Sequence, residues 1–533
     1  MTSPDSRIPK LIFIAVLCAG LLTMTGKLRD SDEFPMILTT QSICERGTFA
    51  IENLNGEGNP LADEWSNMWF NWQHMEDFQY GDRDSAGNLY SKYGFLSSAI
   101  FIPMWFVGML SAALIGLHGA DRLSFIVFIA GLTTPILLAL CAVLLFRIGR
   151  FLGYGVRTSA YLSLALALCS NLLVYGGMYM SEVPQVTFLL MAWYFLFGFI
   201  YGGKPPLWAF LCALSYSFML LVKFADIIYI VPLLFIAAGK IAGPLWDSYS
   251  RLLKGQPVPK AHFRRYSQAV FALIIGILIF PIIFNLYNYA RFSDPMKTGY
   301  IPEYQNLYVP IYYGLIGFLV SPGTSLFLYF PPAILFFWSM KKFARKYPME
   351  IWFLVFHAAI QVIFYSRLVY WAGFWNWGPR YALPILPALL LPVGMLIEGE
   401  GSKRYLNGFR RLCYAGFLVQ LPVLFIHFNE FIRLMRNTFG EPACYIKMFY
   451  IPPYSPILCN WWLLLSKFMG TVFHFPLNIW GMGTEGYTST KLFFVVLSRD
   501  IPAMAPFFII AAIVFLCGAV YAASQLKRVL QVV

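Results

Sequence analysis

Apolar stretches, each about as long as a helix needs to cross a lipid bilayer, recur along nearly the whole chain and constrain its fold most strongly. Only 12% of the residues are charged and the mean hydropathy is +0.63, whereas soluble proteins carry about 25% charged residues. Much of the surface must therefore face lipid, and the sequence predicts an all-α, polytopic transmembrane protein. The candidate spans lie at 11–24, 94–117, 122–146, 158–176, 184–202, 206–222, 226–240, 266–290, 312–338, 350–370, 381–398, 411–428 and 502–524.

Clusters of basic residues indicate the topology, because Lys and Arg favour cytoplasmic loops. If the stretch 94–117 crosses the bilayer, every cluster falls outside; if it lies at the outer interface, every cluster falls inside. The second arrangement predicts twelve crossings with both termini cytoplasmic, and Pro103 and Trp105 suit an interfacial helix. The clusters are Arg147/Arg150/Arg157, 240–265, Lys341/Lys342/Arg345/Lys346, Lys403/Arg404/Arg410/Arg411 and Lys527/Arg528.

This topology leaves two large extracytoplasmic loops, at 27–92 and 429–500. The first loop contains nearly half of the 26 carboxylates of the chain. We expect residues 1–428 to form a transmembrane module that carries the first loop and a juxtamembrane helix, and residues 429–533 to add the second loop and a final helix. The first apolar stretch follows two basic residues like a signal peptide, but no small-residue cleavage site follows it, so it is expected to be retained.

The cysteines and histidines do not predict a metal site. No cysteine pair and no set among the six histidines has the spacing of zinc ligands, and no cofactor is expected. Cys444 and Cys459 share the second loop and are candidates for a disulfide in an oxidising compartment, which would leave Cys44 unpaired. The net charge of +13 is explained by topology and gives no reason to expect a nucleic-acid partner.

An acidic segment, Asp30-Ser31-Asp32-Glu33, follows the first candidate span directly. Carboxylates so close to hydrocarbon are costly unless they are used or compensated. A partly desolvated carboxylate has a raised pKa and can serve as a general base. The alternative is a solvated acidic turn that keeps the loop outside the membrane.

Basic residues flanked by aromatic rings mark two other places at the outer surface. Tyr90-Ser91-Lys92-Tyr93 ends the first loop, and a lysine at headgroup depth either binds a lipid phosphate or extends its amine to the interface. The stretch 371–381 places Arg380 and Tyr381 behind a Gly-Pro turn and three tryptophans. The planar guanidinium of Arg380 suits phosphate oxygens and suits a carboxylate of the first loop equally well.

Four further charged residues are weaker candidates for the same face. Lys223 and Asp226 lie between two short apolar runs, where a structural ion pair is the common outcome. Glu182 is another carboxylate at the outer side. Arg291 begins an outer loop near several aromatic residues, where it either anchors the chain or binds an anion.

Taken in order, these segments resemble the GT-C superfamily of membrane glycosyltransferases. The likeness is closest to the branch of the protein O-mannosyltransferases and the bacterial aminoarabinose transferases of lipid A. Members have an Asp-Glu pair after the first helix, then an amphipathic helix and a glycine, matched here by 32–47. A lysine motif at the loop end, matched by 90–92, precedes a juxtamembrane helix. The stretches 288–300, 317–323 and 378–381 look like later landmarks, so the resemblance spans roughly 10–400.

The resemblance implies transfer of a sugar from a polyprenyl-phosphate donor to an acceptor hydroxyl, with inversion, on the outer face of a prokaryotic plasma (inner) membrane. Asp32 would be the base and Glu33 a supporting carboxylate. Lys92, Arg380 and Arg291, with Tyr381, would hold the donor phosphate. The acceptor is a glycan, a lipid or a protein. Many relatives have prolines after the loop lysine where this chain has Tyr93-Gly94, which leaves the sugar and the acceptor open.

A transporter or flippase of lipid-linked saccharides is the main alternative. Transporters tend to have inverted repeats and ionisable residues near the bilayer midplane. This sequence shows no internal repeat, and its ionisable residues gather at one face. No Walker A, GxGxxG or HExxH motif points to a different chemistry. The pattern therefore favours a transferase.

Overall fold

A computed structural model describes residues 4–51, 81–300, 307–373, 375–399, 402–474, 477–478, 481–484, 486–487 and 489–532. Residues 52–80 of the first loop, which include several of its carboxylates, lie outside the described residues. Eight helical segments of the described chain are long and apolar enough to cross a bilayer. The predicted all-α, polytopic class is therefore confirmed. The number of twelve crossings stays a prediction, because length and composition alone do not fix which helices cross.

The first half of the chain consists of helices and one small hairpin. The elements are α1 (Pro4–Leu22), α2 (Glu33–Arg46), β1 (Gly81–Arg83), β2 (Leu89–Ser91), α5 (Phe95–Ala99), α6 (Ile102–Leu114), α7 (Gly119–Gly131), α8 (Thr133–Phe151), α9 (Val156–Leu168), α10 (Leu172–Tyr175), α11 (Glu182–Tyr201), α12 (Leu207–Val222), η1 (Phe224–Tyr229), α13 (Ile230–Ala237), η2 (Ala238–Ala242) and α14 (Gly243–Leu253).

The regular elements in the described part of the second half are all helices. The elements are α15 (Lys260–Phe292), α16 (Ile311–Val320), α17 (Leu326–Tyr329), η4 (Pro331–Leu335), α18 (Phe336–Lys346), α19 (Pro348–Ser366), η5 (Arg380–Ile385), α20 (Leu386–Leu390), η6 (Leu391–Val393), α21 (Gly394–Ile397), α22 (Lys403–Phe425), α23 (Phe428–Phe439), α24 (Ala443–Tyr450), η7 (Pro452–Tyr454), α25 (Pro456–Phe473), α26 (Phe493–Asp500), η8 (Pro502–Met504) and α27 (Ala505–Val532).

The centre of the bundle is formed by α8 and α11. The helix α8 packs against α1, α9 and α11, and α11 packs in turn against α12. Most residues of α11 are buried on all sides, including Trp193 and Phe197. An apolar sequence without a polar face is what a helix at the centre of a bundle requires.

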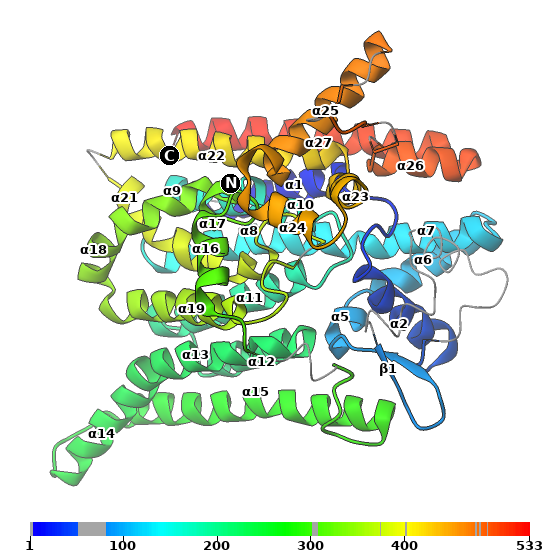
Figure 1. The fold of residues 1–533 in the computed structure, drawn as a ribbon. Helices are drawn as coiled ribbons and strands as arrows, with labels where there is room; N and C mark the ends of the chain where they lie inside the picture. The colour runs from blue at the N-terminus through cyan, green and yellow to red at the C-terminus, as the bar shows by residue number, and fades with distance from the viewer. Residues whose placement is uncertain are drawn as a thin grey trace.

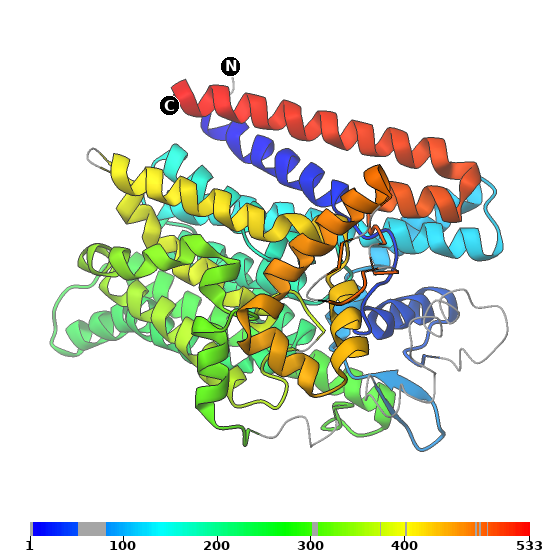
Figure 2. The same cartoon turned by 45° about the horizontal axis from the view of Figure 1, so that its top comes forward.

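Two long helices lie at opposite edges of the bundle (Figure 1). The helix α15 packs on α12, and α27 packs on α1, so that the two ends of the chain lie close together (Figure 2). Both helices expose apolar side chains outward, such as Leu278 and Leu286 on α15 and Ile510 and Val514 on α27. Water would penalise such faces, whereas lipid solvates them.

The elements around the first loop gather at one end of the bundle, where α2, α5, α6 and the hairpin lie together (Figure 1). The two strands pair antiparallel, with Gly81 opposite Ser91. The predicted juxtamembrane stretch 94–117 consists of α5 and α6, which pack against α2. Residues Phe95–Leu114 also meet the length and hydropathy of a span. The interfacial placement of this stretch therefore stays a prediction.

The predicted span at 312–338 is wrong as a single helix. Ser321 leaves the helical conformation after α16, and the chain continues through Pro322 and Gly323 into the short α17. Proline lacks the backbone N–H that an uninterrupted helix needs. The hydroxyl of Ser325 donates to the carbonyl of Leu319 within the break, and the hydroxyl of Ser321 donates to the carbonyl of Phe449 on α24. Side chains of the break therefore satisfy a carbonyl at the end of α16 and join the break to α24.

The predicted second loop, 429–500, folds into α23, α24, α25 and α26, of which α23, α24 and α25 pack together (Figure 2). The candidate disulfide between Cys444 and Cys459 is not formed. Both thiols are buried and free, one on α24 and the other on α25, and Cys44 on α2 is also free. Apolar contacts rather than a covalent bond hold this loop.

Candidate functional site

Asp32 and Arg380 form an ion pair that joins the first loop to the outer end of η5. The Nη2 atom of Arg380 lies 2.7 Å from Oδ2 of Asp32, and both side chains are more than four-fifths buried. Asp32 is the N-cap residue of α2, but its side chain makes no capping hydrogen bond. Its carboxylate is instead directed at the guanidinium, as one of the two interpretations of Arg380 predicted.

A glycine in the left-handed conformation and hydrogen bonds to Tyr175 fix the turn that carries Arg380. Gly378 has a φ of +65°, in the left-handed region that favours glycine, and Pro379 precedes the first residue of η5. The hydroxyl of Tyr175 donates to the carbonyl of Trp377 and accepts from its backbone N–H, at 3.1 and 3.0 Å. The turn therefore holds the guanidinium in one place before any ligand binds.

Lys92 reaches the same cluster from the end of the hairpin. Its Nζ atom lies over the rings of Tyr93 and Tyr300, 5.4 and 5.9 Å from their centroids. Burial lowers the pKa of Lys92, partly opposed by Asp32, and the neighbouring Arg380 adds to the lowering. The structure thus brings Asp32, Lys92 and Arg380 together from three distant segments.

The protonation state of Asp32 follows from these neighbours. Burial opposes its ionisation, but Arg380, Lys92 and a hydrogen bond from the Tyr93 hydroxyl outweigh burial and lower the pKa from 3.8 to about 2. Nearby Asp30 differs, because burial and the charge of Asp32 raise its pKa well above the usual value. The sequence analysis assigned no role to Asp30, Tyr93 or Tyr300, although Asp30 lies in the acidic segment and Tyr93 is adjacent to Lys92.

Glu33 lies in a different environment from Asp32. Its carboxylate is fully buried and accepts backbone hydrogen bonds from Arg29, Asp30 and Tyr179, at 2.6, 3.0 and 2.9 Å. Burial raises the pKa of Glu33 to about 7, although these hydrogen bonds act in the opposite direction. These contacts tie the loop that bears Asp32 to the chain before α11 and suit a supporting carboxylate.

Two further carboxylates, Glu182 and Asp226, are buried near the ion pair. The Oε1 atom of Glu182 is 3.8 Å from Nε of Arg380. Asp226 is buried and accepts from Nε2 of Gln185 with both oxygens, at 2.6 and 2.7 Å. Gln185, which the sequence did not single out, stands one helical turn after Glu182.

In the described structure, Lys223 and Asp226 do not form the expected ion pair. The Nζ atom of Lys223 lies over the ring of Tyr381, 4.5 Å from its centroid, and 5.5 Å from that of Tyr365. The backbone at Lys223 is extended between α12 and η1. Asp226 is satisfied by Gln185 instead.

Arg291, predicted for the donor phosphate, and Tyr90, predicted as a possible additional site residue, make structural contacts. The guanidinium of Arg291 donates to the carbonyl of Ser91 and to Oδ1 of Asn288, at 2.5 and 2.6 Å, and stacks on Tyr287. The hydroxyl of Tyr90 donates to Asp84 in the hairpin, at 3.2 Å. Arg291 therefore fixes the backbone directly before Lys92, and its predicted contact with a phosphate stays a prediction.

Comparison with known proteins gives few likenesses. No protein-family profile and no curated protein matches the chain. Among solved structures, the chain is similar to a crystal structure of ArnT from Cupriavidus metallidurans bound to undecaprenyl phosphate, at 12% identity and a TM-score of 0.45 over 99% of this chain and 79% of that one. It is also similar to the apo state of ArnT, at 11% identity and a TM-score of 0.41 over 99% and 78%.

Proposed function

We propose that this protein is a glycosyltransferase that moves a sugar from a polyprenyl-phosphate carrier to an acceptor hydroxyl at the extracytoplasmic face. The observation that carries the proposal is the buried cluster of Asp32, Lys92 and Arg380, in which one carboxylate and two cations meet. The three residues come from three of the stretches in which the sequence resembles the GT-C superfamily. The transferred sugar is a hexose or a pentose.

In this mechanism the donor phosphate binds to Lys92 and Arg380 and competes with Asp32 for the guanidinium. The acceptor oxygen attacks the anomeric carbon while the bond from that carbon to the phosphate oxygen breaks. The proton of the acceptor hydroxyl passes to Asp32. Polyprenyl phosphate leaves with one more negative charge than it had in the donor, and the two cations stabilise that charge as it develops.

The ion pair also gives Asp32 a suitable protonation state. A carboxylate with a pKa of about 2 is ionised at neutral pH and ready to accept a proton. When the phosphate draws Arg380 away, the buried carboxylate loses a compensating charge and becomes a stronger base. Donor binding and activation of the base are coupled in this way.

The test is a transfer assay with purified protein in detergent, a polyprenyl-phosphate sugar and candidate acceptors, in which release of polyprenyl phosphate is measured. The transferase releases polyprenyl phosphate, and Asp32→Asn binds donor but does not transfer. Asp121→Asn, at an exposed carboxylate on α7, serves as the matched control. Movement of intact donor across vesicles without release of polyprenyl phosphate would support a flippase and overturn the proposal.

A further inference from the structure

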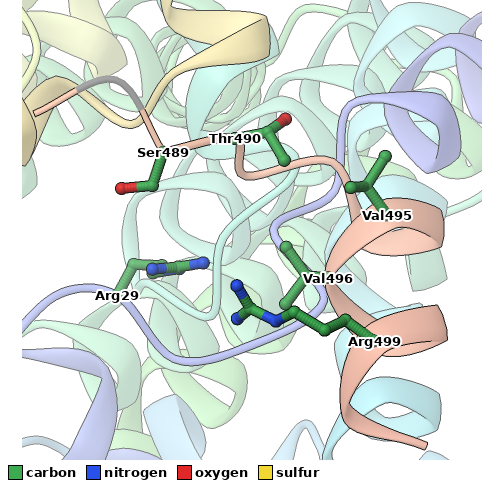
Figure 3. A pocket seen from close by; sticks show the side chains of 6 residues that line it. All are labelled: Arg29, Ser489, Thr490, Val495, Val496 and Arg499. Carbon is green, nitrogen blue, oxygen red and sulfur yellow. The ribbon is translucent and has the colours of Figure 1, made fainter. Parts of the chain in front are cut away.

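A pocket opens between the first loop and the chain that leads into α27, away from Lys92 and Arg380. It has a volume of about 350 Å³ and is lined by Arg29, Ser489, Thr490, Val495, Val496 and Arg499. The guanidinium groups of Arg29 and Arg499 extend toward each other across it (Figure 3). Two like charges that converge on one space repel each other unless an anion lies between them.

Arg29 interacts electrostatically with the buried carboxylate of Glu33. Its Nε atom is nevertheless buried and has no hydrogen-bond partner among the described residues. Arg499 is only partly neutralised, because its Nε atom lies 3.3 Å from Oδ1 of Asp500 while Lys27 lies 2.6 Å from the other oxygen of the same carboxylate. Two cations therefore share one carboxylate at the rim of the pocket.

A third cation lies next to the pocket in the chain. The Nζ atom of Lys491, which follows Thr490, is buried without a hydrogen-bond partner among the described residues, and its side chain interacts electrostatically with Arg29 and Glu33. Burial lowers the pKa of Lys491 to about 7, opposed by Glu33 and assisted by Arg29. An ammonium enclosed in this way is expensive for the fold unless a ligand compensates it.

The hydroxyls of the pocket already have partners. The Oγ atom of Ser489 donates to Glu430 at 3.1 Å, and the Oγ1 atom of Thr490 donates to the carbonyl of Phe425 at 3.2 Å. The protons left for a ligand belong to the arginines. Guanidinium groups bind compact oxyanions through paired N–H donors, and the valines leave room for an apolar substituent beside the anion.

We propose that this pocket is a second anion-binding site, which takes a phosphate or an equally compact oxyanion between Arg29 and Arg499. The anion bridges the first loop and the chain before α27. Its source is either a free anion or the headgroup of an anionic lipid, and both present the same group of oxygens to the two arginines. The site goes beyond the proposed transfer reaction, which uses neither arginine.

The experiment uses the full chain in detergent with sulfate as the probe, because the charge of sulfate does not change near neutral pH. Thermal stability is measured against sulfate at constant ionic strength, with chloride as the reference salt. We expect saturable stabilisation by sulfate beyond that by chloride. Arg499→Gln and Arg29→Gln should each weaken sulfate binding about tenfold, since each removes a charge-assisted donor pair.

Arg436→Gln is the matched control, because Arg436 is an outer-loop arginine that pairs with Glu441 at 3.0 Å and does not line the pocket. Arg499 is mostly exposed, so its replacement does not threaten the fold. A second arm compares nanodiscs of phosphatidylcholine with and without phosphatidic acid. Stabilisation that only phosphatidic acid produces identifies a lipid headgroup, and stabilisation by free sulfate identifies a soluble anion.

Absence of stabilisation by both sulfate and phosphatidic acid overturns the proposal, as does an unchanged response in the double variant Arg29→Gln/Arg499→Gln. Both measurements omit donor and acceptor. Failure of the proposed transfer reaction therefore leaves this result unaffected, and the reverse also holds.

Discussion

Asp32 and Glu33 are neighbours in the sequence, yet their surroundings shift the pKa values of the two carboxylates in opposite directions. Around Asp32, cations compensate a carboxylate and lower its pKa to about 2. Around Glu33, burial dominates: the pKa of Glu33 is raised to about 7 and that of nearby Lys491 is lowered to about 7. Two adjacent residues thus belong to a cluster in which charges compensate each other and to a region in which burial disfavours the charged forms. Burial acts in both regions, and the placement of the guanidinium of Arg380 makes the difference.

The largest expected effect comes from Asp32→Asn, which keeps the shape of the side chain and removes the base. Turnover should fall by about 10²–10⁴-fold, as the loss of a general base typically causes, while donor binding persists. A single-turnover assay with separately measured donor affinity checks both parts. Normal transfer by Asp32→Asn together with an inactive Glu33→Gln would reverse the roles of the two carboxylates.

Lys92→Ala and Arg380→Ala should each weaken donor binding and slow turnover by about a hundredfold, as the loss of an oxyanion donor does. Loss of Arg380 also removes the main charge that lowers the pKa of Asp32, so the acid limb of the kcat/KM profile should move upward from the region near pH 2. Lys447→Ala is the control, because Lys447 also lies over two aromatic rings in the outer loop. Donor affinity in Lys92→Ala equal to that of the wild type would leave Lys92 as an interfacial anchor.

Glu33→Gln should act on stability more than on catalysis. Three backbone N–H groups lose a charged acceptor, and an unsatisfied buried donor costs about 1–3 kcal/mol. Because the pKa of Glu33 rises from 4.5 to about 7 on folding, its contribution to the free energy of unfolding is present below pH 4.5 and is lost as the pH rises through 7. Thermal unfolding across this window should show that decline in the wild type and not in Glu33→Gln.

The matched control for this prediction is Glu45→Gln, at a partly exposed carboxylate on the same helix. It should leave both the melting temperature and its pH dependence unchanged. Equal loss of stability in the two variants would contradict a special role for the buried carboxylate of Glu33.

Lys491→Met should give the smallest change at neutral pH, since an apolar side chain of similar length replaces a buried ammonium. The pKa of Lys491 falls from 10.5 to about 7 on folding. The unfolded chain therefore binds more protons between these values, and the wild type should gain stability as the pH rises through this range. Lys491→Met should lose that gain, whereas Lys403→Met, at an exposed lysine, should keep it.

Much of this arrangement can be predicted from the sequence. Long apolar stretches determine the helical class, and the local motifs together with the resemblance to the GT-C superfamily predict Asp32, Lys92 and Arg380 as residues of one site. Other features depend on contacts that no local pattern contains. The backbone N–H of Tyr179 determines the environment of Glu33, and the carbonyl of Ser91 occupies Arg291. Two adjacent carboxylates differ through partners well over a hundred residues away.

The packing of α27 on α1 has a consequence for biosynthesis. The ribosome delivers α1 and Arg29 to the membrane long before Arg499 and α27. Until α27 is inserted, the side of α1 that it covers has only lipid or other partners to pack on, and until residues 489–499 are made, the arginine-lined pocket lacks one wall. Both features therefore depend on late segments of the chain, and a chain that stopped before residue 489 would form neither.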